Sequence, residues 1–184
     1  MATLYIIGSP IGNLEDITFR AIRILKEVDL ILCEDTRVTK RLLEKYSIET
    51  PTMSYHAQSK LSKVEKIFEL LEDGKNIALV SDAGTQCISD PGVLLGAQVL
   101  ERFKDDVLVA PIPGASALVT ALSASGVSVA EFTFLGFLPH KKGKETLFKE
   151  IAESSRVMVF YESTHRIEKT LESLEKFCGA ERHV

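Results

Sequence analysis

Short apolar runs alternate with longer segments in which apolar residues recur every three or four positions. The short runs are typical of buried strands, and the longer segments have the spacing of helices that pack on one face. Strand–helix alternation of this kind predicts an α/β fold, with a mostly parallel five-stranded sheet and helices on both faces. The predicted strands cover residues 3–7, 30–33, 52–55, 76–80 and 107–110. The first predicted helix begins after Asp16, which can cap it. The other predicted helices cover residues 38–46, 61–73, 91–102 and 115–124.

The pattern changes after residues 125–126. Phe132, Phe134 and Phe137 mark an aromatic strand region, and residues 144–153, 157–161 and 163–177 follow as helix, strand and helix. The two strands predicted in this part of the chain are few for a separate sheet. We therefore predict two domains: an N-terminal α/β domain, residues 1–115, and a partial, truncated α/β domain, residues 116–184.

Two polar loops rich in small residues follow predicted strands. Residues 8–13 follow the first strand, and residues 81–92 follow the fourth. Ligands bind at the carboxyl ends of strands in open α/β sheets, so we expect one ligand cleft lined by both loops. Gly8 and Gly12 fit neither the dinucleotide nor the phosphate-loop glycine pattern. The nine residues between the fourth strand and Asp90 exceed the usual ~2–6, which favours a ligand loop over an ordinary turn.

Composition narrows the classes of function. A net charge of −4 argues against a protein that coats nucleic acid by charge alone, although it leaves room for a local basic patch. No stretch reaches the ~18–20 apolar residues of a membrane span, and the N-terminus lacks the basic segment of a secretory signal. Three distant cysteines indicate a reducing cytoplasm rather than a disulfide framework. Neither His56 nor His165 has a partner at ligand spacing, so no metal site is expected.

Four further segments each allow two interpretations. Residues 34–37, with paired carboxylates, can bind a ribose or accept a proton, or can simply begin a helix. Residues 111–116 can present backbone to a planar ring, or can form a stiff connector. The lysines of residues 141–144 can bind RNA or form a solvated loop. Residues 161–162 end a buried strand, where the side chains can reach a cleft or pack in the core.

Six motifs occur in an order that resembles a known family. They are residues 9–14, 34–37, 81–92, 111–114, 136–139 and 160–163. Together they resemble the tetrapyrrole methylase superfamily, and in particular its members that methylate ribosomal RNA. The resemblance runs the whole chain. It implies S-adenosylmethionine as methyl donor, a cytidine 2′-hydroxyl in the decoding region of 16S rRNA in the small ribosomal subunit as acceptor, and a two-domain homodimer with the donor between the domains.

The resemblance and the loops together assign candidate site residues. The candidates for donor binding are Pro10, Ser81, Asp82, Ala83, Gly84, Ile88, Ser116, Ala117, Tyr161 and Glu162. The candidates for substrate binding are Asn13, Arg37, His56, Lys141, Lys142 and Lys144. The acceptor hydroxyl needs a base or strong polarisation, for which Glu34, Asp35 and Glu162 are unranked candidates. No metal is implied.

The chain departs from the family pattern in three places. Gln86-Cys87 stands where the family usually has proline and glycine, Ala115 stands where it usually has proline, and the chain stops at Val184 where family members continue. We therefore expect a second domain that is poorly protected or that dimerises through exposed apolar surface, with weak or absent catalysis. Two alternative functions stay open. One is a tetrapyrrole or protein methyltransferase of the same superfamily, and the other is an inactive fragment that binds the donor or dimerises.

Overall fold

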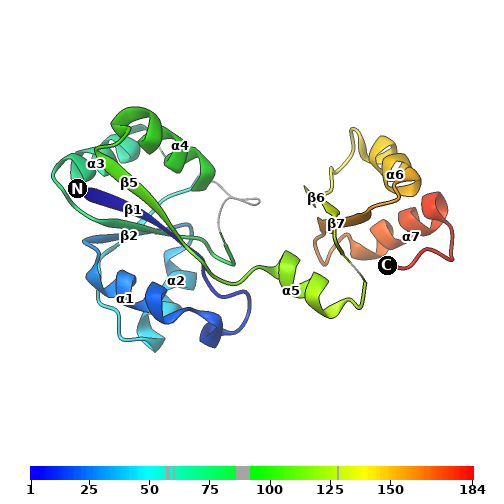
Figure 1. The fold of residues 1–184 in the computed structure, drawn as a ribbon, viewed down its shortest axis with the longest axis horizontal. Coiled ribbons are helices and arrows are strands. Elements are labelled where there is room, and N and C mark those ends of the chain that lie inside the picture. Colours follow the sequence, from blue (N-terminus) through cyan, green and yellow to red (C-terminus); the bar gives the residue numbers. More distant parts are fainter. Residues whose placement is uncertain (57–58, 60, 86–91, 128) are drawn as a thin grey trace. The chain divides into compact units, whose positions relative to one another are not determined.

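The computed structural model describes residues 1–56, 59, 61–85, 92–127 and 129–184. It divides into two compact units, Met1–Thr120 and Ala121–Val184 (Figure 1). The division falls inside the helix α5 (Ala117–Ala124). The domain boundary drawn from the sequence, between residues 115 and 116, stays a prediction.

The first unit is an alternating α/β structure. Its five strands form one sheet in the order β3-β2-β4-β1-β5, and every pair is parallel. The predicted five-stranded parallel sheet is therefore confirmed. Along the chain the elements are β1 (Ala2–Ile7), the short helix η1 (Leu14–Asp16), α1 (Phe19–Glu27), β2 (Leu30–Cys33), α2 (Thr36–Lys45), β3 (Thr52–Ser54), α3 (Leu61–Glu72), β4 (Ile77–Val80), α4 (Gly92–Phe103) and β5 (Val107–Ile112).

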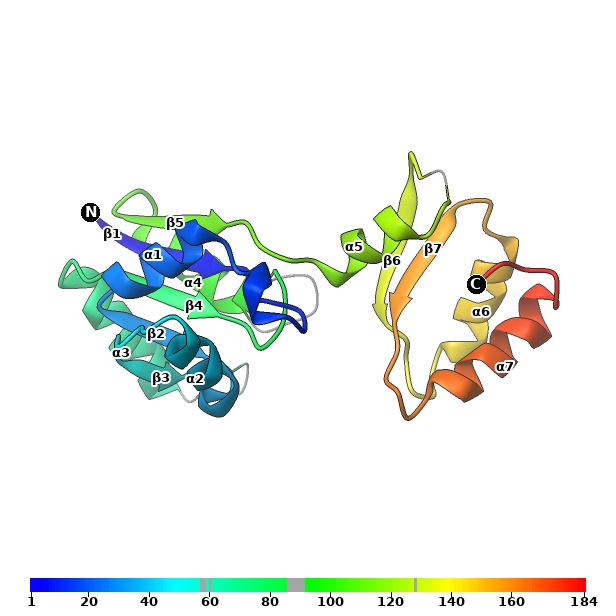
Figure 2. The ribbon, with the colours of Figure 1, turned by 90° about the horizontal axis from the view of Figure 1, so that it is seen from below.

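Helices cover both faces of this sheet. Successive side chains of a strand point to opposite faces, and β4, buried throughout, shows the result. Ile77 and Leu79 enter a core with α3 and α4, whereas Ala78 and Val80 enter a second core with α1 and α2. Figures 1 and 2 show the two helix pairs on opposite sides of the sheet. None of the helices among the described residues has the length and apolar character needed to cross a membrane.

Apart from shifts of one or two residues at the ends of elements, two details of the first unit differ from the sequence predictions. Asp16 does not cap α1; the Thr18 hydroxyl accepts the Ala21 N–H (3.1 Å) instead, and Asp16 lies in η1. Pro111 and Ile112, predicted as part of a rigid turn, belong to β5. A proline fits there because β5 is the last strand of the sheet, where a missing N–H breaks no ladder. The helix start predicted at residues 90–91 lies outside the described residues.

The second unit is smaller. It contains β6 (Phe132–Phe137), α6 (Lys144–Glu153), β7 (Val157–Tyr161) and α7 (Ile167–Cys178). The two strands pair in parallel, and α6 and α7 pack on one face of them (Figure 2). The helix predicted over residues 144–153 and the strand over 157–161 are confirmed, while α7 begins later than predicted. Four residues form the buried core: Leu138, Phe148, Ile151 and Leu174.

Candidate active site

Three loops meet at the carboxyl edge of the five-stranded sheet. They are residues 8–10 after β1, residues 81–85 after β4 and residues 113–116 after β5. They lie together because β1 stands between β4 and β5 in the sheet. Backbone hydrogen bonds join them: Gly8 N–H to the Ile112 carbonyl (3.1 Å), Ser9 N–H to the Gly84 carbonyl (3.0 Å) and Thr85 N–H to the Ala115 carbonyl (2.9 Å).

Gly8 and Gly114 allow the first and third loops to touch through their backbones. A Cβ on Gly8 would lie 2.7 Å from the Cα of Gly114, and a Cβ on Gly114 would lie 2.6 Å from the Gly8 carbonyl oxygen. Both distances are too short for any side chain. Gly84, in the second loop, has a φ of +82°, a conformation that disfavours other residues. The junction of the loops is therefore fixed by glycine.

Hydroxyl groups tie the second loop to its neighbours. The Ser81 hydroxyl donates to the Gly84 carbonyl (2.8 Å) and lies 3.4 Å from the Ser9 hydroxyl. The Thr85 hydroxyl donates to the Ala115 carbonyl (3.0 Å). Ser81, a predicted donor contact, thus has a structural bond of its own. Thr85 was absent from the predicted site, although it belongs to the loop motif that suggested it.

Ser116 differs from these hydroxyls. Its Oγ is buried and has no hydrogen-bond partner within the described part of the chain. The residue stands just before α5, and its carbonyl accepts the Thr120 N–H (2.9 Å). Buried polar atoms are rarely left unpaired without a reason, such as a ligand that pairs with them. Of the other predicted donor residues in this unit, Pro10 is buried, Asp82, Ala83 and Ala117 are exposed, and Ile88 lies outside the described residues.

Asp82 links the β4 loop to the start of α2. Its Oδ1 accepts the Asp35 backbone N–H (3.1 Å). Asp35 in turn caps α2 and binds the Arg37 guanidinium at two atoms, Nε (3.1 Å) and Nη2 (2.7 Å). The Arg37 side chain is 90% exposed and so is held in place from one side only.

The pKa of Asp35 follows from these contacts. Hydrogen bonds from the Arg37 side chain and backbone lower it to about 2. A carboxylate that is this weakly basic is a poor proton acceptor near neutral pH. Asp35 begins α2 as its N-cap, as the helix-start interpretation of residues 34–37 expects, and its role in proton acceptance stays a prediction. Glu34 is half-buried between the end of β2 and this cap.

Glu162, in the second unit, is held in a buried ion pair. Its carboxylate pairs with Arg166 and accepts the Ser163 N–H (2.7 Å) and the Thr170 hydroxyl (2.9 Å). The Arg166 guanidinium also donates to the Leu138 carbonyl (3.2 Å). Burial opposes ionisation of Glu162, but these hydrogen bonds and the positive charge outweigh it and lower the pKa. Glu162, which follows β7, therefore bonds to α7 through Thr170. Through Arg166 it is also linked to Leu138, the residue that follows β6.

The remaining candidates have the following contacts within their own units. The Asn13 side chain accepts the Glu15 N–H (3.0 Å) and so caps η1. The His56 side chain is exposed, as are Lys141 and Lys142, while Lys144 lies over the Phe148 ring (5.5 Å). The Tyr161 ring contacts two phenylalanines of β6. Among the described residues no group of three or more histidine, cysteine or carboxylate side chains could hold a metal ion.

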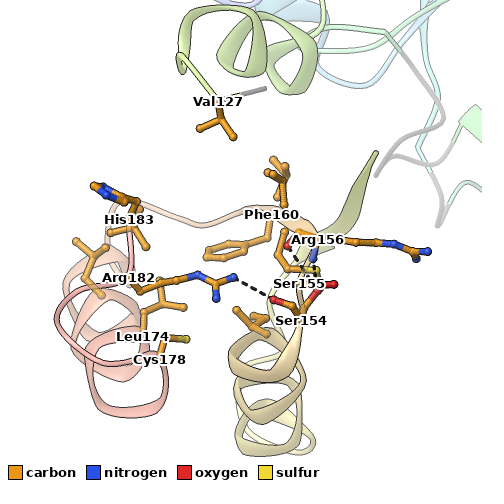
Figure 3. A pocket seen from close by; sticks show the side chains of 15 residues that line it. Val127, Ser154, Ser155, Arg156, Phe160, Leu174, Cys178, Arg182 and His183 are labelled. Carbon is orange, nitrogen blue, oxygen red and sulfur yellow. Dashed lines mark hydrogen bonds between the residues drawn. The ribbon is translucent and has the colours of Figure 1, made fainter. Parts of the chain in front are cut away.

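Two of the hollows in the structure, one in each unit, have nearly the same volume. One, of about 510 Å³, adjoins the loop junction and is lined by Ile6, Thr85, Val109 and residues 111–114. The other, of about 520 Å³, belongs to the second unit and lies beside β7 (Figure 3). Its lining is mostly apolar, and it is closed at one side by the Arg182 guanidinium, which donates to the Ser154 carbonyl (3.4 Å). None of the predicted site residues lines either hollow.

The first unit is thus a parallel sheet with a loop junction, fixed by glycine, at its carboxyl edge. The chain belongs to the tetrapyrrole (corrin/porphyrin) methylase family, whose sequence model matches residues 3–184. Two solved structures share the fold. A cobalamin biosynthetic enzyme, cobalt precorrin-4 methyltransferase, superposes with a TM-score of 0.67 at 18% identity over 97% of this chain and 76% of that chain. Diphthine synthase gives a TM-score of 0.69 at 16% identity, over 95% and 71%.

More similar relatives carry the name ribosomal RNA small subunit methyltransferase I. Those of Halalkalibacterium halodurans and Bacillus subtilis are 48% and 49% identical to this chain, over 99% and 97% of its length. The match covers 62% and 61% of those relatives, so the chain spans about three fifths of their length. The relative from Thermotoga maritima is 45% identical over 97% of this chain and 79% of its own.

Proposed function

We propose that this chain binds S-adenosylmethionine and transfers its methyl group to a cytidine 2′-hydroxyl in the decoding region of 16S rRNA, in the small ribosomal subunit. The observation that carries the proposal is the 45–49% identity, over nearly the whole chain, to relatives named for methylating small-subunit ribosomal RNA. The family match to methylases supports the same reaction class. We further propose that the protein works in the cytoplasm as a homodimer.

The loop junction suits the donor. When bound, S-adenosylmethionine supplies a methyl group on a positively charged sulfur. Ser116 offers a buried hydroxyl that needs a partner, and the glycine-fixed backbone permits close approach of a ligand. We assign donor binding to the exposed tip of the β4 loop, to Ser116 and to the start of α5. The sequence also assigns Tyr161 and Glu162 to the donor. For Glu162 we propose a supporting role, because its carboxylate already bonds to Arg166, the Ser163 N–H and the Thr170 hydroxyl.

The acceptor hydroxyl must lose a proton. Both Asp35 and Glu162 are held as carboxylates of low pKa by their own partners, which makes them weak bases. We propose Glu34 as the proton acceptor on its position in the sheet. It follows β2 directly, and β2 is the neighbour of β4 in the sheet.

Cationic side chains are assigned to the RNA. Arg37 keeps guanidinium N–H groups that do not face Asp35 and can meet a phosphate. Lys141, Lys142 and Lys144 form the local basic stretch on an otherwise acidic chain. Asn13 and His56 stay proposed substrate contacts.

Two measurements test this function. Small ribosomal subunits that lack the modification are incubated with the chain and a methyl-labelled donor; label should enter 16S rRNA, and the modified linkage should resist alkali because a 2′-O-methyl group blocks strand cleavage. Calorimetry of donor binding is run in parallel. An Asp82→Ala variant should bind the donor more weakly, since its loop loses the bond to the Asp35 N–H.

The outcomes separate the candidate functions. Donor binding without label in the RNA would indicate a different acceptor or an inactive fragment. Unchanged donor affinity in Asp82→Ala, with intact binding by the unsubstituted chain, would contradict the placement at the loop junction.

A further inference from the structure

A bulge in β6 gives the second unit an aromatic surface. Phe134 pairs with Val159 and Phe137 pairs with Tyr161, so β6 has one more residue than β7 between these pairs. Strand residues three apart normally point to opposite faces, and the extra residue brings Phe137 to the same face as Phe134. Gly136 makes the bulge possible because its φ is +65°, a backbone conformation that is unfavourable for other residues.

This face points away from the core of the unit. Leu135, Met158 and Phe160, on the opposite face, pack with residues of α6 and α7. Figure 2 shows both helices on one side of the two strands. We call the four rings on the other side the aromatic face: Phe132, Phe134, Phe137 and Tyr161. The Tyr161 ring lies 5.0 Å from that of Phe134 and 5.4 Å from that of Phe137, centre to centre.

Two of the four rings are open to solvent. Phe132 is 41% exposed and Phe137 is 57% exposed. Without the bulge Phe137 would point toward the helices and could add to a core that has only four fully buried side chains. The bulge therefore removes apolar area from the core and places a third phenylalanine on the outer surface. Bulges that re-aim a side chain often accompany binding sites.

A basic segment begins directly beyond the aromatic face. His140, Lys141 and Lys142 are exposed and start three residues after Phe137. Flat rings on a sheet surface together with lysines nearby are the combination by which proteins bind unpaired nucleotides: bases stack on the rings, and cations meet the phosphates. We propose that the aromatic face stacks unpaired bases of the RNA substrate. This inference rests on the proposed function and adds the surface that receives the RNA.

A second copy of the chain is the competing occupant. A two-fold contact through this face would use the same patch on both copies. It would also bring the two basic segments toward each other, and like charges at a contact oppose association. RNA phosphates have the opposite charge, so the charge pattern favours RNA.

The chain contains no tryptophan, which allows a direct test of stacking. A Phe137→Trp variant has a single reporter, and its fluorescence should be strongly quenched when a single-stranded oligoribonucleotide of decoding-region sequence is added. The matched control is Phe19→Trp, at the start of α1 in the first unit, where the side chain is 93% exposed. Its fluorescence should change little.

Phe137→Leu then separates stacking from simple apolar packing. Loss of one stacked base costs roughly 1–3 kcal/mol, so the oligoribonucleotide should bind about 5- to 150-fold more weakly, with KM for small subunits raised and kcat nearly unchanged. Phe137→Tyr keeps a ring and should restore binding. Thermal unfolding of each variant checks that the second unit is intact.

Failure of this inference is distinguishable from failure of the proposed function. If the unsubstituted chain methylates small subunits but Phe137→Trp is not quenched and Phe137→Leu binds RNA normally, the aromatic face does not stack bases and the function stands. If Phe137→Leu converts a dimer to a monomer in sedimentation while RNA affinity is unchanged, the face is a contact between copies. Quenching by RNA without methylation would support stacking and overturn the proposed reaction.

Discussion

The two units differ in how completely helices cover their strands. All four residues of β4 are buried between two helical layers, whereas all five residues of β7 are only partly buried. The first unit therefore closes its sheet with its own helices, and its loops are fixed backbone to backbone. The second unit covers one face and leaves aromatic rings on the other. This difference fits the two proposals, in which the first unit positions the donor and the second unit contacts the RNA.

The largest expected effects come from removing one buried phenylalanine ring from each of the two cores. Phe68→Ala in the first unit and Phe148→Ala in the second each remove a buried ring, at a cost of roughly 3–5 kcal/mol. The second unit has few other buried residues to compensate. Hydrogen exchange should show Phe148→Ala with residues 132–178 unprotected and the first unit intact.

Phe68→Ala should instead leave the first unit folded but weaker, with protection reduced throughout its sheet. Equal behaviour of the two variants would contradict the contrast between the units, since it would mean that the second core is as robust as the first.

The next effect tests the glycine contact in the first unit. Gly8→Ala must push the β1 and β5 loops apart, because the new Cβ would lie 2.7 Å from the Gly114 Cα. Such overpacking costs roughly 1–3 kcal/mol, and we expect donor binding to be lost as the loops separate. Urea unfolding and calorimetry measure the two effects.

Gly96→Ala is the matched control. A Cβ at Gly96, inside α4, meets no atom within 4 Å, and alanine favours helix by roughly 0.5–1 kcal/mol. This variant should be slightly more stable and bind the donor normally. A stable Gly8→Ala variant with normal donor affinity would show that the loop junction is not rigid.

Much of this architecture could be predicted because it is encoded locally. Apolar runs and helical spacing gave the strands and helices of both units, and the order of elements gave the parallel sheet. The contact of Gly8 with Gly114 could not be predicted in the same way, since it joins residues on different strands. The bulge at Gly136 was also missed, because a glycine inside a strand has several possible causes.

The side-chain partners of the candidate residues were harder to predict for a similar reason. Residue type marked Asp35 and Glu162 as possible bases, but their partners decide their chemistry. Arg37 follows Asp35 closely enough to be suspected, whereas the ion pair of Glu162 with Arg166 depends on the turn into α7. The described parts of both loops follow β1 and β4 as predicted, and their role in ligand binding stays a prediction. The pairing of individual side chains needed the structure.

The third prediction compares two low-pKa carboxylates, one in each unit. Glu162→Gln leaves Arg166 without its buried partner and should cost roughly 1–3 kcal/mol. Asp35→Asn, in an exposed pair, should cost much less. Unfolding by urea at neutral pH measures both.

The pH dependence has the same sign for both groups. A pKa lowered by folding adds stability above the ordinary value of the group, and this stability is lost as the pH falls through the lowered value. The Glu162 contribution should therefore decline below pH 4.5, and the Asp35 contribution between pH 3.8 and about 2. Glu145→Gln, in an exposed pair with Lys149, is the control and should leave the pH dependence of stability unchanged. An unchanged acid response in Glu162→Gln would show that the buried pair does not contribute to the pH dependence of stability.

The smallest effect concerns two serines of the first unit, and it asks whether the site is already formed before a ligand binds. Ser81 donates to the Gly84 carbonyl, so Ser81→Ala should lower the free energy of unfolding by roughly 1 kcal/mol. The Ser116 hydroxyl has no partner among the described residues, so Ser116→Ala should leave the stability of the free protein unchanged or slightly raised. Donor affinity should nevertheless fall by roughly 2- to 10-fold, the value of one hydrogen bond. A Ser116→Ala variant that is destabilised without loss of donor affinity would mean that the hydroxyl serves the fold, and the contrast between a preformed first unit and an open second unit would lose its most specific support.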